Sequence, residues 1–529
     1  MLRFSLYQQS LDEVDPGELG LAADAFERGL RDVLPRLASP EAFADLYGEE
    51  GAGSRCPLQL LGMELLKYRF DLSDSEVVGR CRRDLGFRYA IGLRKGEQAP
   101  GTATLTRFRA KLRRVKGDDF IQARVLELAV TEGALTDSEL QAVDSTNTDC
   151  RGAVIDTFNL VAAAIRQVVR QLARCLERDP AALAEEWKLE RYMARSIKGQ
   201  VSIDWNDREA RHALITEEIR DADRLAARIA DLRLALPEAV TEAVATLAQV
   251  ARQDVEKRPD GTFEIAQRTA PGRVISITDP EARHGRKSSS KAINGFKTHI
   301  MGTIASQFVT GIIVTDAGTH DSRPTSALIE QAAEHGLKPR EALGDGAYGT
   351  GANVRQAAAC GVDLRTKYVV PSSNNGSISK RAFDIDLDAM QITCPAGVTT
   401  TEFAWVKDAE GAAEKVPRFR FAKAACLGCK LRSQCSSDTA SGTRGRTILL
   451  GAHEAELQRL KAFNESEAGP ALLRKRSAVE RLISHLVRLG MRHARFFGMQ
   501  KVQFQAFMTA AAYNLQRLFT LTESRATAG

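Results

Sequence analysis

The sequence lacks any long hydrophobic run. The longest apolar run near the middle of the chain, Leu160 to Ile165, is far shorter than the roughly 18 residues that a membrane-spanning helix needs. The first ten residues, MLRFSLYQQS, also lack the basic segment followed by an apolar segment that marks a secretion signal. We therefore predict a protein of the cytoplasm that has no membrane partner.

The sequence also lacks the common nucleotide-binding and zinc-protease motifs. It contains no Gly-x4-Gly-Lys-Ser/Thr segment, no Gly-x-Gly-x-x-Gly on a strand-to-helix turn, and no His-Glu-x-x-His. These motifs place phosphates or zinc in ATPases, dinucleotide-binding enzymes and zinc proteases. The sequence therefore gives those three chemistries no support.

The net charge is small, because the chain has 74 basic and 68 acidic side chains. This average conceals opposed regions. The first 50 residues hold 11 acids and 4 bases, whereas residues 80–116 hold 12 bases and 2 acids, and residues 474–501 hold 8 bases and 1 acid. Each basic window is either a solvated face or a phosphate-binding surface. Two such windows in one chain favour nucleic acid as the partner.

The length of 529 residues, with 43% hydrophobic and 27% charged residues, is typical of a globular chain with three or four folded units. Residues 1–120 have a helical pattern, with apolar residues following Pro57, a capping box at Ser73-Asp-Ser-Glu76, and a basic helix from Thr104. Residues 155–255 are predicted to be helical again, and the apolar spacing of Ile215 to Ile229 indicates a paired helix.

Alternating apolar residues predict strands elsewhere in the chain. The segment Leu140 to Asp144 has the pattern of a strand that ends at the acid, and three further strands are predicted at 273–279, 297–304 and 308–315. A helix over 322–335, a short strand near 342–345 and a helix from about 352 follow. Residues 385–450 have no regular pattern, and residues 474–521 are predicted to be helical with a break near Phe496. This order predicts a mixed α/β core interrupted by a helical insertion.

Three acids stand in settings that suit catalysis: Asp144 in Val-Asp-Ser-Thr-Asn, Asp345 in Leu-Gly-Asp-Gly-Ala-Tyr-Gly, and Glu480 in Arg476-Ser-Ala-Val-Glu. Carboxylates at strand ends and on a facing helix can hold two Mg²⁺ ions for phosphoryl transfer. Simpler interpretations exist for each acid. Asp144 can be an ordinary acid at a strand end, Asp345 a turn residue, and Glu480 the i, i+4 partner of Arg476.

With these motifs in order, the chain resembles the bacterial insertion-sequence transposases of the DDE type, which have an RNase H-like core. The N-terminal part of the resemblance consists of Leu61-Gly-Met-Glu-Leu-Leu-Lys-Tyr, Asp71-Leu-Ser-Asp-Ser-Glu-Val and Thr104-Leu-Thr-Arg-Phe-Arg. The catalytic part consists of Val143-Asp-Ser-Thr, Thr315-Asp-Ala-Gly-Thr-His-Asp, Gly344-Asp-Gly-Ala-Tyr-Gly and Arg476-x3-Glu480. Two positions depart from the third-acid signature, which tends to carry Tyr and Lys where this chain has Leu473 and Val487. Arg488 is adjacent to the second of these positions.

The resemblance implies a division of the chain. The implied parts are a helical domain at 1–125 that recognises transposon ends, a first part of the RNase H-like core at 135–154, a helical insertion at 155–265, a second part of the core at 270–384, a cysteine-rich segment at 385–450 and a C-terminal catalytic helix region at 470–521.

The resemblance also implies that Asp144, Asp345 and Glu480 are the catalytic metal ligands, for two Mg²⁺ or Mn²⁺ ions. The basic windows supply the residues expected to bind DNA, which are Arg107, Arg109, Lys111, Arg113, Arg476, Arg488 and Arg492.

Four of the nine cysteines fall in the cysteine-rich segment. Cys394 precedes a Cys-x2-Cys-x5-Cys group made of Cys426, Cys429 and Cys435. Four thiolates suit a tetrahedral structural Zn²⁺ site, and a reducing cytoplasm disfavours disulfides. Four free thiols and an iron–sulfur cluster are the alternatives.

The implied function is a DNA transposase that binds the terminal inverted repeats of an insertion sequence, cleaves the DNA and joins the 3′-hydroxyl ends to target DNA. Its partners would be double-stranded DNA, as transposon ends and as target, and a second copy of the chain, because two ends must be paired. Its place would be the nucleoid. The alternatives are a related metal-dependent nuclease without strand transfer, and a non-catalytic DNA-binding protein derived from a transposase.

Overall fold

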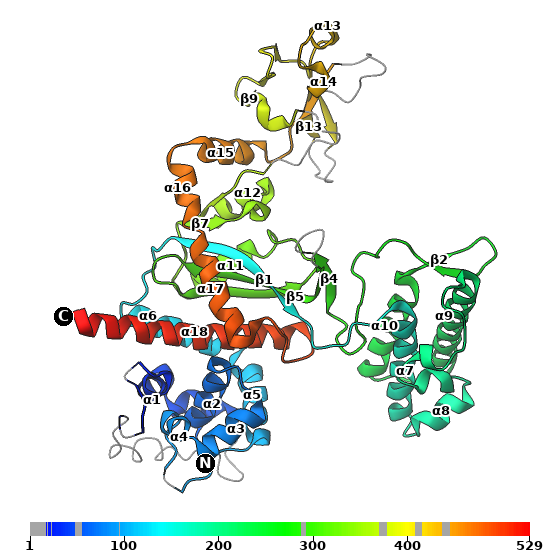
Figure 1. Cartoon of the computed structure of the whole chain (residues 1–529), viewed down its shortest axis with the longest axis vertical. Coiled ribbons are helices and arrows are strands. Elements are labelled where there is room, and N and C mark those ends of the chain that lie inside the picture. Colours follow the sequence, from blue (N-terminus) through cyan, green and yellow to red (C-terminus); the bar gives the residue numbers. More distant parts are fainter. Residues whose placement is uncertain are drawn as a thin grey trace.

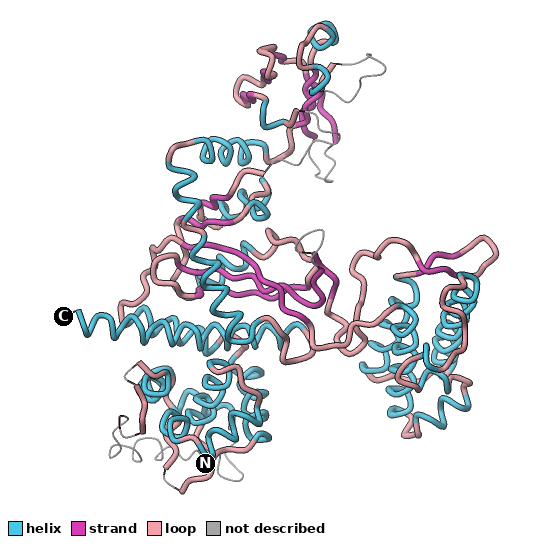
Figure 2. Tube along the Cα trace, viewed as in Figure 1, coloured by secondary structure: helices cyan, strands magenta, loops and turns pink. Residues whose placement is uncertain are grey.

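The structure is a computed structural model, and it describes residues 17, 19–22, 24–47, 55–94, 96–286, 292–369, 378–407, 415–435 and 445–528. Figure 1 shows a helical domain below a central sheet, a helical unit to one side and a small cysteine-rich unit at the top. Figure 2 shows that strands are concentrated in the centre and in the cysteine-rich unit. The fold is therefore a mixed α/β arrangement.

The N-terminal domain is built around one helix that is buried on nearly every side. That helix, α2, starts at Pro57, a residue suited to the first turn of a helix, and all its residues from Pro57 to Tyr68 are buried. The predicted capping box at Ser73 and Glu76 is present at the start of α3. The helices of this domain are α1 (Phe26–Leu37), α2 (Pro57–Arg69), α3 (Asp74–Arg83), α4 (Leu85–Ala90), α5 (Thr102–Lys116) and α6 (Phe120–Thr131).

The central sheet mixes antiparallel and parallel pairs. Strand β1 pairs antiparallel with β5 and parallel with β7, β7 pairs parallel with β8, and β4 and β6 pair antiparallel with the outer edge of β5. The strands are β1 (Gln141–Asp149), β4 (Arg283–Arg286), β5 (Ala292–Thr303), β6 (Val309–Asp316), β7 (Glu341–Gly344) and β8 (Asp363–Thr366).

Helices cover both faces of this sheet. Apolar residues of α11 (Thr325–Glu334) and α12 (Gly351–Ala359) form a core with Val143 and Met301 on one face. On the other face, α17 (Ser477–Leu486) and α18 (Met499–Ala528) pack against Phe296 and Ile300. A π-helical turn at Val487–Met491 follows α17. Irregular chain then leads to α18 and includes the break predicted near Phe496.

Strand β6 would be an exposed edge, and side chains of α18 and α11 cap its free backbone groups. Asn514 and Gln503 accept hydrogen bonds from the N–H groups of Val309 and Val314, each at 2.9 Å or less. Gln331 does the same for Ile312 at 2.6 Å. Because an unpaired strand edge invites pairing with another chain, these amides protect the sheet and fix α18 along it.

The helical unit has a core of its own. Helices α7 (Thr157–Cys175), α8 (Pro180–Glu186), α9 (Arg208–Asp231) and α10 (Glu238–Gln253) enclose it, and a small hairpin of β2 (Val255–Lys257) and β3 (Phe263–Ile265) packs against it. The predicted apolar face of α9, including Ile215, Ile219 and Ile229, is buried in this core. That face is therefore covered within the chain and is not a free surface for a second copy.

Two predictions about strands were wrong. No strand forms over 273–279, where only an isolated bridge joins Val274 to Arg283. Val274 is buried in the core of the helical unit, and Ile275 is buried in the core beside α17. The apolar residues of 273–279 alternate because the segment passes between these two cores. Asp144 does not end a strand, since β1 continues to Asp149.

The cysteine-rich unit is more regular than its sequence suggests. It contains two three-stranded antiparallel sheets around a core that includes Phe383 and Phe419. Its elements are β9 (Asp384–Asp386), β10 (Gln391–Thr393), β11 (Thr399–Thr400), β12 (Phe403–Lys407), β13 (Lys415–Arg420), β14 (Thr447–Leu449), α13 (Lys423–Leu427) and α14 (Arg432–Cys435). Helices α15 (Glu454–Glu465) and α16 (Ala468–Arg474) then lead back to α17.

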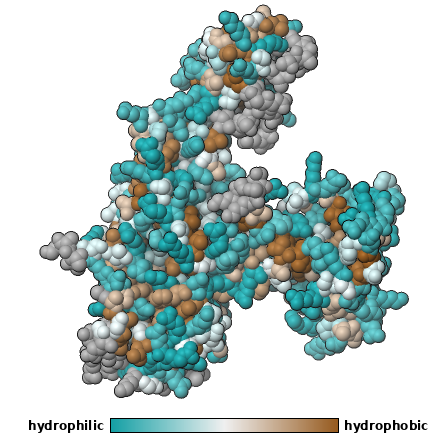
Figure 3. All heavy atoms as spheres, viewed as in Figure 1, coloured by the Kyte–Doolittle hydropathy of each residue, from teal (hydrophilic) through white to brown (hydrophobic). Residues whose placement is uncertain are grey.

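The viewed surface is mostly hydrophilic, with hydrophobic residues scattered in small groups (Figure 3). Among the helices in the part of the chain that the structure describes, none combines the length and the apolar character of a membrane span.

Candidate active site

The first two predicted acids lie on adjacent parallel strands. Strands β1 and β7 pair in a register that sets Ala142 beside Leu343. Asp144 and Asp345 each lie two residues beyond this last pair, and the two carboxyls are close enough for the charge of Asp345 to act on Asp144. Asp345 follows the last residue of β7, where its Oδ1 accepts a hydrogen bond from the N–H of Ala347 at 2.9 Å. It is thus both the turn residue of the simpler interpretation and a neighbour of Asp144.

The third acid, on α17, is linked to Asp144 by the arginine that immediately precedes this helix. Arg476 Nη1 donates to Asp144 Oδ2 at 2.9 Å, and Arg476 Nη2 donates to Glu480 Oε1 at 2.5 Å. The i, i+4 pair that the sequence allows is therefore present, and the same guanidinium also bonds to the acid on β1. Arg476 and Asp144 are 332 residues apart in the chain, so this contact depends on the whole fold.

Asp144 is half-buried and lies among charged side chains. Burial raises the pKa of the Asp144 carboxyl, the hydrogen bond from the Ser145 N–H and the charge of Arg476 lower it, and the charge of Asp345 raises it further. The net direction is upward. A further positive charge near Asp144 would relieve both the burial cost and the repulsion from Asp345.

A second polar group lies on the opposite side of β1, and three of its members, Ser145, Asp321 and Tyr348, stand in the motifs that carry the resemblance. Lys297 Nζ donates to Asp321 Oδ1 at 2.9 Å, and Ser145 Oγ donates to the same oxygen at 3.3 Å. Tyr348 is fully buried, and burial together with the charges of Asp321, Asp144 and Asp345 raises its pKa well above the usual range. The signal in the sequence is their position, because Ser145 directly follows Asp144 and Tyr348 follows Asp345 by three residues.

His299 belongs to this group as a neutral side chain. Burial lowers its pKa to about 4, so the imidazole is uncharged at neutral pH. Its Nε2 lies 3.0 Å from Thr315 Oγ1, and its Nδ1 is buried without a partner among the described residues. The ring therefore fills the sheet face next to Ser145 on β1, with which it is paired in register.

The donor set at the site suits a hard divalent cation. Asp144, Asp345 and Glu480 supply only carboxylate oxygens, which are the ligands that Mg²⁺ and Mn²⁺ take in proteins. Within the described residues, no three His, Cys, Asp or Glu side chains converge closely enough to hold a metal ion as they stand. At this site the reason is physical, because the Arg476 guanidinium lies between two of the three carboxylates and supplies the positive charge there.

The basic helix α5 exposes fewer charges than its sequence predicts. Arg107 is exposed, and Lys111 is half-buried with its ammonium 5.0 Å from the centre of the Tyr47 ring. Arg113 is paired with Asp118 at 2.6 Å. Arg109 requires a correction: only 6% of it is exposed, and it bonds to Glu64 and Asp74. Its role in the structure is to pair buried charge rather than to face DNA.

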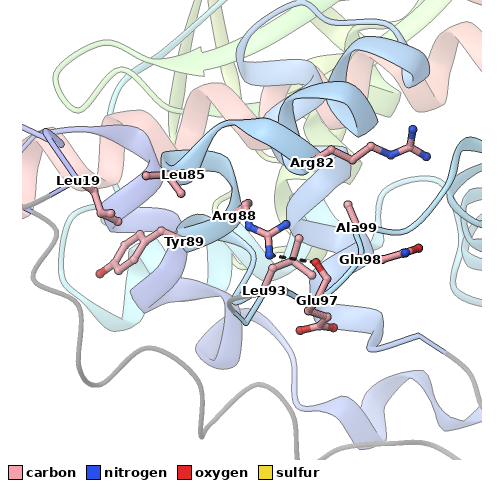
Figure 4. A pocket seen from close by; sticks show the side chains of 10 residues that line it. Leu19, Arg82, Leu85, Arg88, Tyr89, Leu93, Glu97, Gln98 and Ala99 are labelled. Carbon is pink, nitrogen blue, oxygen red and sulfur yellow. Dashed lines mark hydrogen bonds between the residues drawn. The ribbon is translucent and has the colours of Figure 1, made fainter.

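Other arginines of the same window stabilise loops. Arg88 Nη2 donates to the carbonyl oxygens of Arg94 and Glu97 at 2.6 and 3.0 Å. The second bond is drawn in Figure 4, at a cavity of about 720 Å³ between α4 and the following loop. Lys116 is paired with Asp45 at 2.6 Å. Acids from outside the window therefore neutralise part of its charge.

The three predicted arginines near the third acid differ from one another. Arg476 bridges two carboxylates, as described above. Arg492 Nη1 donates to Asn147 Oδ1 on β1 at 3.0 Å, so it helps to fix this strand. Arg488 is exposed on the surface.

The four predicted cysteines line one small cavity of about 40 Å³, which is large enough for a single ion. All nine cysteines of the chain are free. The N–H of Leu431 lies 3.4 Å from Cys429 Sγ, and the N–H of Arg446 lies 3.4 Å from Cys426 Sγ. Burial and the charges of the other three thiols raise the pKa of Cys435. The donor chemistry fits zinc, although the sulfurs do not yet converge to ligand distances.

Two protein-family models match the chain. The family described as Transposase DDE domain matches residues 393–519, and the family described as Transposase domain matches residues 19–111. The first match includes Glu480 and the cysteines from Cys394 to Cys435, and the second includes most of the N-terminal domain. No curated protein and no solved structure matches the chain. The two matches support the assignment as an insertion-sequence transposase of the DDE type.

Proposed function

We propose that this chain, an insertion-sequence transposase of the DDE type by its two family matches, binds the terminal inverted repeats of its element, cleaves the DNA and joins the freed 3′-hydroxyl ends to target DNA. The observation that carries the proposal is the meeting of Asp144 and Glu480 on one guanidinium, beside Asp345. The mixed sheet, with the first two acids on adjacent parallel strands and the third on a covering helix, supports an RNase H-like core.

Asp144, Asp345 and Glu480 would hold two Mg²⁺ or Mn²⁺ ions. When bound, such ions activate a water or a 3′-hydroxyl and stabilise the leaving oxygen in phosphoryl transfer. Arg476 would orient the carboxylates of Asp144 and Glu480, because it hydrogen-bonds to both. Lys297 and Ser145 would fix Asp321 behind β1, which keeps the strand that carries Asp144 in one position.

The pairing of two ends supports a homodimer on DNA, located at the nucleoid. Since the apolar face of α9 is buried within its own unit, the contact between copies would use another surface. The described cysteine cavity supports a structural Zn²⁺ held by Cys394, Cys426, Cys429 and Cys435.

The experiment uses the full chain, Mg²⁺ and labelled duplexes taken from the DNA that flanks its coding sequence. We expect cleaved ends and strand-transfer products, both removed by EDTA. Asp144→Asn, Asp345→Asn and Glu480→Gln should each reduce both products by on the order of 10³-fold, because each removes an interaction needed for the chemical step. The matched control is Glu467→Gln, an exposed carboxylate between α15 and α16, which should keep full activity.

The outcomes separate the proposal from its alternatives. Cleavage without joined products would identify a nuclease that lacks strand transfer. Binding of the end duplexes with no metal-dependent cleavage would identify a non-catalytic DNA-binding protein. Unchanged cleavage by all three acid variants would overturn the assignment of the site.

A further inference from the structure

A cavity of about 350 Å³ lies where α17, α18 and the end of α2 meet. Its lining is strongly basic and contains no carboxylate. The residues that matter here are Arg69 from α2, Arg481, His485 and Arg488 from α17 and the π-helical turn after it, and Tyr513 and Arg517 from α18. The cavity therefore joins the N-terminal domain to the helix that carries Glu480.

Among the described residues, none of these four arginines has a carboxylate within ion-pair distance, in contrast to Arg109 and Arg113. Two of them use their Nε for neutral partners. Arg69 Nε donates to Gln516 Oε1 at 3.1 Å, and Arg517 Nε donates to the carbonyl oxygen of Ser306 at 2.7 Å. These bonds hold the two guanidinium groups in place and engage neither of their terminal nitrogens.

Of the acids near the cavity, Glu27 acts on one of the four arginines, and Asp71 and Glu480 are paired with arginines outside the cavity. Partial burial and the positive charges of Arg488 and Arg517 lower the pKa of His485, so His485 is neutral near pH 7 and adds a donor without further charge. Asp71, close to the π-helical turn at Gly490, is paired with Arg495. Glu27 acts on Arg69, and Glu480 is bonded to Arg476. An anion is the ligand that suits a cavity lined by four guanidinium groups and no carboxylate.

The position of the cavity relates it to the candidate active site. Arg481, His485 and Arg488 are spaced at i, i+4 and i+7, so they lie on one face of the helical segment. Arg488 follows Glu480 by eight residues, which is roughly 12 Å along a helix. An anion bound in the cavity would therefore lie close enough to Glu480 for one DNA strand to reach both, with a few nucleotides between them.

We propose that this four-arginine cavity binds a backbone phosphate of the DNA strand that enters the site at Glu480. The proposal rests on the proposed function and extends it, since it assigns Arg69, Arg481 and Arg517 to the recognition of phosphate and links the N-terminal domain to the catalytic helix through one ligand. The guanidinium fork suits two oxygens of one phosphate. The contact would position the strand without reading its sequence.

The test measures how DNA binding depends on salt. Each phosphate contact contributes about 0.9 to the slope of log K against log salt concentration. Because one phosphate is proposed, we expect the double variant Arg481→Ala/Arg488→Ala, with both changes at exposed positions, to reduce the slope by about 0.9 and to weaken binding equally for end duplexes and unrelated duplexes. The control is Arg459→Ala on α15, whose side chain is 73% exposed, and it should leave the slope unchanged.

A second arm separates DNA phosphate from a free anion, with inorganic phosphate as the probe. If millimolar phosphate raises the Tm of the wild-type chain but not of the double variant, and the double variant also loses salt slope, the cavity takes the DNA backbone as proposed. If phosphate protects only the wild type and the slopes of all variants are equal, the cavity holds a free anion and the proposal is overturned. Equal slopes with no protection by phosphate would overturn it as well.

A failure of the phosphate-binding proposal can be distinguished from a failure of the proposed function. Should the wild type cleave and join end duplexes while the cavity variants keep the full slope, only the cavity assignment fails. Should the wild type bind no duplex at all, the proposed function fails first.

Discussion

At the scale of single residues, the arginines show what charge counting can and cannot predict. Residues 80–116 carry 12 bases and 2 acids, yet Glu64, Asp74, Asp118 and Asp45 pair with bases of this window from other parts of the chain. A count along the sequence has no access to such partners, because they depend on how helices pack. The sum of charge in a window therefore overestimates the charge on the surface.

Arg109 and Arg107 lie two residues apart on α5 and should respond to mutation in opposite ways. Arg109→Ala leaves Glu64, whose side chain is fully buried, without its strongest partner. Removing one member of a buried ion pair costs about 3–5 kcal/mol, so we expect a large loss in the free energy of unfolding, measured by urea denaturation. Arg107→Ala should change that free energy by less than about 0.5 kcal/mol and should instead weaken DNA binding.

The ion pairs of Arg109 and Lys67 with Asp74 should also make the free energy of unfolding depend on pH. Burial raises the pKa of Asp74, but the hydrogen bonds and charges of Arg109 and Lys67 outweigh it and lower the pKa to about 2, from the usual 3.8. A carboxyl whose pKa is lowered by folding stabilises the protein above its unfolded pKa, and that contribution is lost as the pH falls toward 2. Arg109→Ala should reduce this acid-induced loss. Equal unfolding free energies for both alanine variants would show that the buried pair does not stabilise the domain.

At the scale of elements, the sequence predicted regular patterns well and mixed environments poorly. The capping box at Ser73, the basic helix α5, strands β5 and β6, and the helices after them were confirmed. The segment 273–279 was wrongly predicted because its buried residues enter two cores while only an isolated bridge at Val274 pairs it with another strand. The three acids were predicted from motifs, and the meeting of Asp144 with Arg476 was not, because it needs the register of β1 against β7 and the placement of α17.

The cysteine-rich unit should depend on zinc for its stability. Its core is small and includes Phe383 and Phe419, and small units commonly need a metal or another cross-link. We expect the purified chain to contain one zinc ion per molecule by elemental analysis, and Cys426→Ser or Cys429→Ser to lose it. Chelation should increase proteolysis within residues 378–450 before it affects the rest of the chain.

Cys175→Ser is the matched control for this prediction. Cys175 lies at the end of α7, packed against the core of the helical unit, so the substitution should retain the zinc. Wild-type protein with no bound zinc, and with proteolysis that is insensitive to chelators, would favour four free thiols. A bound iron–sulfur chromophore would identify the other alternative.

At the scale of the whole molecule, the two ends of the chain form one core. Phe504, Met508 and Leu515 of α18 are buried together with Leu30 and Leu34 of α1, and the Phe519 ring lies 5.6 Å from the ring of Phe26. Gly29 on α1 is needed for this contact, since a Cβ there would lie 2.6 Å from Phe519. Figure 1 shows α18 running between the sheet and the N-terminal helices.

This arrangement couples the N-terminal domain to the candidate active site. Helix α18 contacts β6 through Gln503 and Asn514, and it follows α17, the helix of the third acid. Arg525 extends the contact by donating from Nη2 to the carbonyl oxygen of Gly133 at 2.8 Å. The N-terminal domain therefore packs directly against the helix that follows α17 in the chain.

We predict that residues 24–138 do not fold alone and do fold when residues 498–529 are supplied on a second chain. Without α18, the apolar faces of α1, α2 and α6 are exposed to water, at a cost of about 25 cal/mol for each Å² of apolar surface. Circular dichroism and urea denaturation should show a cooperative transition only for the two fragments together. Residues 153–278 are the matched control, because the helical unit has its own core and should unfold cooperatively alone. Cooperative unfolding of residues 24–138 alone would show that the N-terminal domain is independent, and the proposed coupling to α17 would then have no structural basis.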